Sequence, residues 1–257
     1  MSIRSALAAL LLNALTCGLV AAHSEAASMS ARGATTTPAA VPGSEPGVAL
    51  FSAHYQADWK SMSVGSSDLE LRQDTAPGHY IYTWTITAHG IFRMIYRDDL
   101  VQKSWLRIRN EHVLPLKYSA VDGSATANLD FDWDAGRARG KTEKKDVDLQ
   151  LELGTQDVMS IQVEVMLDLK NGDLPKTFQV IDRDEVKEFM YAKEGTATIG
   201  TAIGDLDTII VSSRRPGGNR ILTMWFAPSL GFVPVKAERT RDGKLEFAMR
   251  IKSLKRL

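Results

Sequence analysis

Cysteine is almost absent from this sequence of 257 residues, which contains a single one, Cys17. Cys17 lies in an N-terminal segment with the features of an export signal, and we expect cleavage after Ala22. The mature chain would then contain no cysteine, which excludes disulfide bonds, thiolate catalysis and cysteine-based metal sites. A lipid anchor on Cys17 is not expected, because a small residue normally precedes a lipidated cysteine and here Thr16 precedes it.

The sequence also lacks an excess of charge of either sign. Lysine plus arginine and aspartate plus glutamate both number 31, so the formal net charge is zero. No general attraction to nucleic acid or to an anionic membrane follows from such a balance, and we expect no nucleic-acid partner. With 44% apolar and 24% charged residues, the chain has enough apolar side chains for a sizeable core.

The common fingerprints of catalysis and cofactor binding are missing. The chain has no G-x-S-x-G elbow, no phosphate-binding loop and no dinucleotide-binding glycine motif. Its five histidines do not pair at the spacing that puts two metal ligands on one face of a strand or helix. We therefore expect no cofactor and no metal site, and we assign no catalytic residue.

Three alternating aspartates at residues 129–136 are the one pattern that suggests calcium. A calcium loop needs glycine at its sixth position and glutamate at its twelfth, but these positions are Ala135 and Lys141. Phe131 and Trp133 alternate with the aspartates. The segment is therefore predicted to be a strand whose aspartates face solvent.

Long hydrophobic runs are also scarce. The apolar stretch at residues 6–20 follows Arg4 and ends at small residues, as expected for a signal peptide at residues 1–22, and no membrane span is expected in the mature chain. Residues 23–47 consist mostly of alanine, serine, threonine, proline and glycine, which predicts a flexible leader. A single β-rich domain is expected at residues 48–257.

What this domain does contain is a succession of short β-type segments separated by turns. Residues 79–86, HYIYTWTI, are aromatic and β-branched, and Asp122-Gly123 is typical of a hairpin turn. Residues 195–204 are expected to be rich in turns. Arg214, Arg215 and Arg220 flank another turn and are expected to be exposed. The pattern predicts a curved antiparallel sheet, an open barrel or half-barrel of roughly ten or more strands.

Residues 154–172, GTQDVMSIQVEVMLDLKNG, carry two competing patterns. A helix over residues 155–171 is supported by Thr155 as a possible N-cap, by Gly172 as a stop, and by an apolar face that only Gln162 interrupts. That face consists of Val158, Ile161, Val165 and Leu169. A strand is supported by the strict alternation of apolar and other residues from 159 to 169. The pattern alone leaves both readings open.

A second unusual segment, residues 90–97, joins two of the expected strands and is apolar for a connection. Its candidate contact residues are Ile91, Phe92, Met94, Ile95 and Tyr96. The segment could fold back into the core, line the rim of a hydrophobic cavity, or meet a membrane or a protein partner.

Taken in order, several short motifs resemble those of one bacterial family. They are Ser104-Trp105, Phe131-Asp132-Trp133, Thr155-Gln156-Asp157 followed by Ser160, a hairpin over residues 196–206, and the segment 225–235. The chain from about residue 48 to residue 254 resembles the domain-of-unknown-function 3108 family of exported proteins. The resemblance implies a mainly antiparallel β domain with a helix and a place in the cell envelope. It favours the helix over the strand at residues 155–171 and implies no reaction.

Three functional hypotheses follow. The first is a non-enzymatic periplasmic protein that binds an apolar or amphipathic ligand such as a lipid, by loose fold analogy to periplasmic lipoprotein carriers. Its predicted ligand-binding residues are Ile91, Phe92, Met94, Ile95, Tyr96, Val158, Ile161, Val165 and Leu169. The second is a protein–protein interaction module that holds an envelope protein. The third is a hydrolase, which would require a polar cluster assembled only by the fold.

Overall fold

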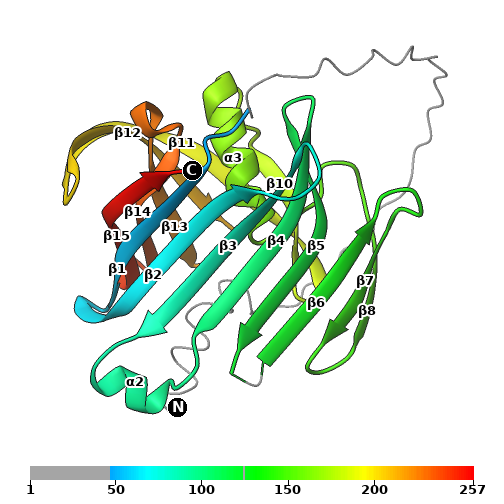
Figure 1. Ribbon diagram of the computed structural model, residues 1–257, viewed down its shortest axis with the longest axis horizontal. Coiled ribbons are helices and arrows are strands. Elements are labelled where there is room, and N and C mark those ends of the chain that lie inside the picture. The colour runs from blue at the N-terminus through cyan, green and yellow to red at the C-terminus, as the bar shows by residue number, and fades with distance from the viewer. Residues whose placement is uncertain (1–46, 124) are drawn as a thin grey trace.

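The computed structural model describes residues 47–123 and 125–257 (Figure 1). The expected signal peptide at residues 1–22, Cys17, and the predicted leader apart from Gly47 lie outside the described residues. No helix within the described ranges is long and apolar enough to cross a membrane.

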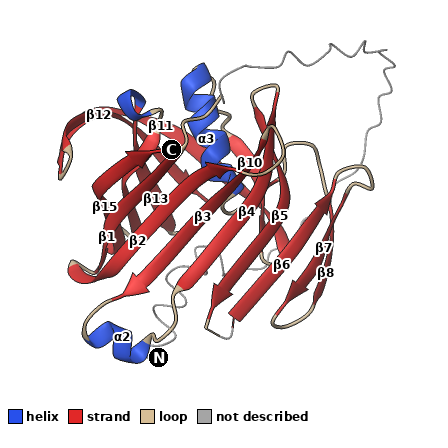
Figure 2. Ribbon diagram, viewed as in Figure 1, coloured by secondary structure: helices blue, strands red, loops and turns tan. Residues whose placement is uncertain are grey.

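A single sheet of fifteen strands dominates the structure (Figure 2). The strands are β1 (Phe51–Trp59), β2 (Met62–Gln73), β3 (His79–Ala88), β4 (Leu100–Arg109), β5 (His112–Asp122), β6 (Ala125–Asp132), β7 (Arg137–Thr142), β8 (Asp146–Gln150), β9 (Gln156–Asp157), β10 (Thr177–Asp182), β11 (Glu185–Thr201), β12 (Gly204–Arg214), β13 (Arg220–Ala227), β14 (Val233–Arg241) and β15 (Lys244–Arg256). The helices are α2 (Ile91–Ile95), α3 (Ser160–Asn171) and the short 3-10 helix η1 (Pro228–Leu230).

Two antiparallel meanders make up this sheet. Strands β1 to β8 form the first and β10 to β15 the second, and the first and last strands of the domain, β1 and β15, pair to join them. The short strand β9 pairs with β10 in parallel, with α3 as the crossover between them. The edge strands β8 and β9 do not pair with each other, so the sheet is open. The prediction of a curved, open antiparallel sheet with one main helix is confirmed.

The sheet curls so that its two meanders face each other across α3 (Figure 1). Strand β1 shows how the sequence builds the inner face: Phe51, Ala53, Tyr55 and Ala57 alternate along it and are all buried. The hydroxyl of Tyr55 donates a 2.6 Å hydrogen bond to the carbonyl oxygen of Pro234, in the opposite half of the chain. The core therefore lies inside the curl, between strands that are distant in sequence.

Helix α3 begins later than its sequence predicts. Its first residue is Ser160, and residues 156–157 form β9. The prediction of Thr155 as the N-cap is wrong, because its hydroxyl accepts the N–H of Glu152 at 3.3 Å and so closes the preceding turn. The predicted stop is confirmed at Gly172, which has a φ of 84° that favours glycine.

The surroundings of α3 explain its ambiguous pattern. Nine of its twelve residues are buried: Ser160, Ile161, Val163, Glu164, Val165, Met166, Leu167, Asp168 and Leu169. A helix surrounded by protein has apolar residues on all sides, so the 3.6-residue period fades. It packs against β4, β5 and β9. Because the helix is buried on nearly all sides, apolar residues also fall at alternate positions, and the resulting pattern resembles that of a strand.

A second difference lies in β11. Residues 195–204 are predicted to be rich in turns, but β11 continues to Thr201 and pairs with β12 from Met190 to Thr201. The register shifts between Lys193 and Gly195, and Gly195 has a φ of 133°. A glycine in a strand often marks such a bulge rather than a turn, so the glycines at 195 and 200 were poor indicators of chain reversal.

Candidate functional site

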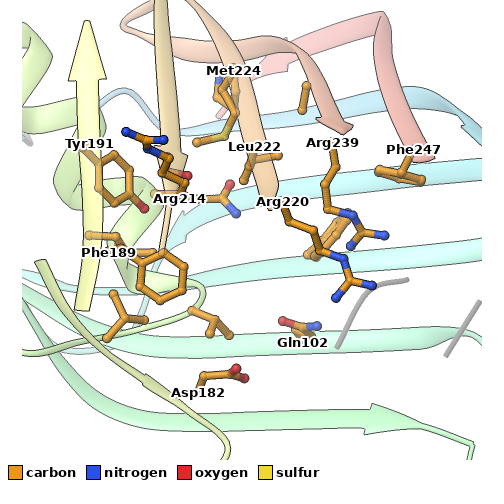
Figure 3. Close-up of a pocket in the computed structure, with 18 of the residues that line it drawn as sticks. Gln102, Asp182, Phe189, Tyr191, Arg214, Arg220, Leu222, Met224, Arg239 and Phe247 are labelled. Atoms are coloured by element: carbon orange, nitrogen blue, oxygen red, sulfur yellow. The ribbon is translucent and has the colours of Figure 1, made fainter. Parts of the chain in front are cut away.

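A cavity of about 170 Å³ lies inside the curled sheet (Figure 3). Strands from both meanders line it, together with the N-terminal end of α3. Its apolar walls include Leu69, Val180, Phe189, Leu222, Met224 and Phe247. The cavity therefore forms where the curl of the sheet brings the two meanders together, and its lining comes from several segments of the chain.

The two-residue period of the strands decides which side chains reach the cavity. On β13, Arg220, Leu222 and Met224 line it, whereas the alternate residues Ile221 and Thr223 do not. The alternate residues Phe189 and Tyr191 of β11 also line the cavity, as do Ala237 and Arg239 of β14.

Charged residues gather at one part of this lining. Four arginines, Arg214, Arg215, Arg220 and Arg239, line the cavity, and Asp182 is the one acidic residue among the lining residues. Asp182 offsets them only in part, because Lys187 donates to it at 2.8 Å and both side chains are buried. Burial raises the pKa of Asp182, while Lys187, and then Arg183 and Arg215, oppose that rise. Positive charge therefore exceeds negative charge in the lining.

Arg239 is the most deeply buried of these arginines, with 6% of its surface exposed. The carboxylate of Glu246 lies between two guanidinium groups, with its Oε2 3.3 Å from Nε of Arg239 and 3.3 Å from Nε of Arg220. Within the described residues, Nη2 of Arg239 has no hydrogen-bond partner. Burial lowers the pKa of Arg239, and Arg220 adds to this effect while Glu246 opposes it, so that the pKa is about 10. Arg239 is still charged at neutral pH.

The neutral polar groups of the site bond to one another. The hydroxyl of Tyr82 donates to Oε1 of Gln162 at 3.0 Å, and that of Tyr118 donates to Oε1 of Gln102 at 3.3 Å. Gln162 is the residue that interrupts the apolar face of α3, and its place is explained by this bond to β3. The glutamines thus accept bonds from neighbouring tyrosines, in contrast to the incompletely bonded Arg239.

The predicted ligand-binding residues fall into three places. Val158 and Ile161 line the cavity. Val165 and Leu169 are buried in the core and are not among the lining residues. The remaining five, Ile91, Phe92, Met94, Ile95 and Tyr96, form α2 and its C-cap, away from the lining residues. The structure therefore does not unite the two predicted sets, and their role in binding stays a prediction.

Helix α2 has no buried residue, so the connection at residues 90–97 meets the core only through partly buried side chains. Ile91 is 70% exposed and Met94 76% exposed, while Phe92 packs against the core from a partly buried position. An apolar surface of this kind suits a contact with another molecule better than a role in the fold.

The sequence patterns did not identify the arginines as part of the site. Arg214 is exposed as expected, but Arg215 and Arg220 are half-buried, and all three line the cavity. Arg239 was not singled out. A signal was present, because Val235, Ala237 and Arg239 occupy alternate positions of one strand and therefore share its inner face.

Two of the motifs quoted for the family resemblance meet in the core. The hydroxyl of Ser104 donates to Oδ2 of Asp157 at 2.6 Å, and both residues are fully buried. The other carboxylate oxygen of Asp157 accepts the N–H groups of Met159 and Ser160, at 2.7 and 2.8 Å. These motifs hold the start of α3 against β4. No histidine is among the residues that line the cavity.

Comparison with known proteins supports the fold and identifies the family. A crystal structure of a beta-barrel-like protein of DUF1849 from Brucella abortus matches with a TM-score of 0.53 and 11% identity, covering 82% of this chain and 98% of that one. The crystal structure of MucB is a more distant match, with a TM-score of 0.34 and 9% identity, covering 81% of this chain and 53% of that one. No curated protein matches. Residues 54–250 match the family described as "Protein of unknown function (DUF3108)". The chain therefore belongs to the DUF3108 family.

Proposed function

We propose that this protein is a non-enzymatic binding protein of the periplasm whose cavity receives the apolar part of an amphipathic ligand. One observation carries the proposal: the curled sheet contains an apolar-lined space of about 170 Å³ between its two meanders. Packed protein interiors contain few voids larger than a water molecule. A space of this size, lined by side chains from both halves of the sheet, supports a role in binding.

The volume limits what can enter. An engineered apolar cavity of about 150 Å³ binds benzene, whereas pockets for drug-sized ligands have roughly 300–1,000 Å³. The cavity therefore suits a ring or a short segment of an acyl chain rather than a whole lipid. Arg214 lines it and is exposed, so the site reaches the surface and the rest of a longer ligand could remain outside.

Filling the cavity tests the proposal. The neutral fluorophore N-phenyl-1-naphthylamine is expected to bind the wild-type protein with increased fluorescence. Leu222→Trp places a larger side chain in the cavity, and we expect it to weaken binding by at least about tenfold, or roughly 1.4 kcal/mol. The measurement is a fluorescence titration that gives the Kd of each protein.

The matched control is Ile221→Trp on the same strand. Its side chain points to the opposite face of β13 and does not line the cavity, so binding is expected to stay within about twofold of the wild type. Equal weakening by both variants, or no saturable binding by the wild type, would contradict the proposed function.

A second candidate, a module that holds an envelope protein, is favoured by the exposed apolar surface of Ile91 and Met94 on α2. A photo-crosslinking residue in place of Met94 in intact cells separates the two. Reproducible protein adducts support the module, and adducts to lipid support ligand binding. A crosslinker in place of the exposed Lys141 on β7 provides the background.

A further inference from the structure

We infer that the ligand of this cavity has an anionic head group and that Arg239 binds it, with Arg220 beside it. The inference rests on the proposed function, because it names the chemistry of the ligand at the same site. Three observations carry it: the charge balance of the lining, the burial of Arg239, and the arrangement of apolar and cationic groups along the cavity.

The charge balance comes first. Four arginines line the cavity, and the single acidic lining residue, Asp182, is already engaged by Lys187 at 2.8 Å. Behind the lining, the carboxylate of Glu246 is shared between Arg220 and Arg239 at 3.3 Å from each. Glu246 does not satisfy the whole guanidinium group of Arg239, because its Nη2 has no hydrogen-bond partner among the described residues. An anion in the cavity would supply that partner.

The burial of Arg239 is the second observation. Arginine is seldom buried to this extent unless it is fully paired, because removing its charge from water is costly. The contact between Arg239 and Glu246 lacks the alignment of a hydrogen bond, and Nη2 has no partner in the described part of the chain. Guanidinium groups bind carboxylates and phosphates through two parallel N–H donors. Arg239 therefore keeps an available donor at a place where water is largely excluded.

The arrangement of the lining suits an amphiphile. Figure 3 shows the guanidinium groups of Arg220 and Arg239 side by side, with Phe247 and Leu222 near them in the same cavity. An acidic head group on the arginines would place its chain among these apolar side chains. A carboxylate and a phosphate monoester share this chemistry, and a choline-type cation would meet repulsion instead.

The test compares four ligands with the same eight-carbon chain and different heads. Octanoate, octyl phosphate, 1-octanol and octyltrimethylammonium are titrated against the wild-type protein with bound N-phenyl-1-naphthylamine, below their aggregation concentrations. At least one of the two anions is expected to displace the fluorophore at a concentration about tenfold lower than octanol, and the ammonium at a higher one than octanol. A stronger effect of octyl phosphate would indicate a phosphate head, and one of octanoate a carboxylate.

The variant Arg239→Gln tests whether the preference for anionic ligands depends on Arg239. It is expected to remove the preference for the anions over octanol, which is about tenfold in the wild type. Arg139→Gln is the matched control, because Arg139 lies on β7, is exposed and does not line the cavity. Circular dichroism confirms that each variant is folded, and the wild-type comparison decides the question should Arg239→Gln not fold.

The outcomes separate the two proposals. Equal displacement by octanol and both anions, or stronger displacement by the ammonium, would overturn the anionic head group and leave the apolar cavity function in place. An anion preference that Arg239→Gln and Arg139→Gln reduce equally would overturn the assignment to Arg239. No displacement by any of the four, together with no binding of the fluorophore, would overturn both.

Discussion

Replacing Asp157 by alanine is expected to lower the free energy of unfolding by about 3–6 kcal/mol, since it removes the bonds that hold the start of α3. The fully buried carboxylate accepts three hydrogen bonds, from Ser104 on β4 and from the N–H groups of Met159 and Ser160. Alanine would leave these three donors buried without partners, at about 1–3 kcal/mol for each one that finds no water. Most domains have only about 5–15 kcal/mol of stability, so this loss is large.

Urea denaturation followed by circular dichroism gives the change in free energy. Thermal melting should show a decrease in Tm of roughly 6–24 °C, at about 2–4 °C per kcal/mol for a domain of this size. The control is Asp157→Asn, whose side-chain oxygen can still accept the two backbone N–H groups. Burial raises the pKa of Asp157 to about 6 against the hydrogen bonds that lower it, so the ionised form is disfavoured in the folded state and removing the charge costs no stability.

Asp157→Asn is therefore expected to lose no more than about 1 kcal/mol. A loss in the alanine variant as small as that in the asparagine variant would show that the three hydrogen bonds are not what holds α3 at this point.

Asp168→Asn is expected to stabilise the protein at pH 8 and to change its stability little at pH 4. Asp168 lies in the last turn of α3, where the helix dipole disfavours negative charge, and its Oδ2 has no hydrogen-bond partner among the described residues. Burial raises the pKa of Asp168, the nearby Glu164 and Asp173 add to the rise and His112 and Lys193 oppose it, so that the pKa is about 7. At pH 8 the wild type therefore keeps an unfavourable buried carboxylate.

The sign follows from proton linkage. The pKa of Asp168 is raised to about 7 in the folded state, above its ordinary value of 3.8, so the folded state binds the proton more tightly. The resulting stability is fully present below about pH 4 and is lost as the pH rises through 7. A shift of one unit corresponds to about 1.4 kcal/mol, and allowing for solvent screening we expect a gain of about 2–4 kcal/mol for the asparagine variant at pH 8.

Urea denaturation of both proteins at pH 4 and pH 8 measures this difference. The matched control is Asp130→Asn, which removes an exposed carboxylate on β6 that does not act on Asp168. Its effect is expected to stay below about 0.5 kcal/mol at either pH. Destabilisation by Asp168→Asn at pH 8, or an equal gain at both pH values, would show that the carboxylate of Asp168 has a favourable partner in the folded protein.

The candidate site was predictable only in part. Val158 and Ile161 were identified because they fall on an apolar stripe, and the structure places both at the cavity. Val165 and Leu169 share that stripe, but the stripe is longer than the cavity, and these two pack in the core instead. The sequence does not identify Arg239 as a site residue, because a charged residue on a strand is normally expected to face solvent. Its alternation with Val235 and Ala237 was the only local sign of the inner face.

The sequence by itself determined the local structure of most of the domain. Alternating side chains determine strands such as β1, aromatic and β-branched residues favour strands such as β3, and turn residues such as Asp122-Gly123 end strands. These signals act between near neighbours in the chain. The absence of cysteine after residue 17 likewise needs no structure to exclude disulfides from the domain.

Only the tertiary structure decided the state of residues 154–172 and the existence of the cavity. Helix α3 is buried on nearly all sides, so its apolar residues carry no period that distinguishes a helix from a strand. Its start depends on Asp157 meeting Ser104, which lies 53 residues earlier in the chain. The cavity depends on β1 pairing with β15 and on the curl that follows, which are contacts between the two ends of the domain. Such long-range contacts leave no pattern in any single segment.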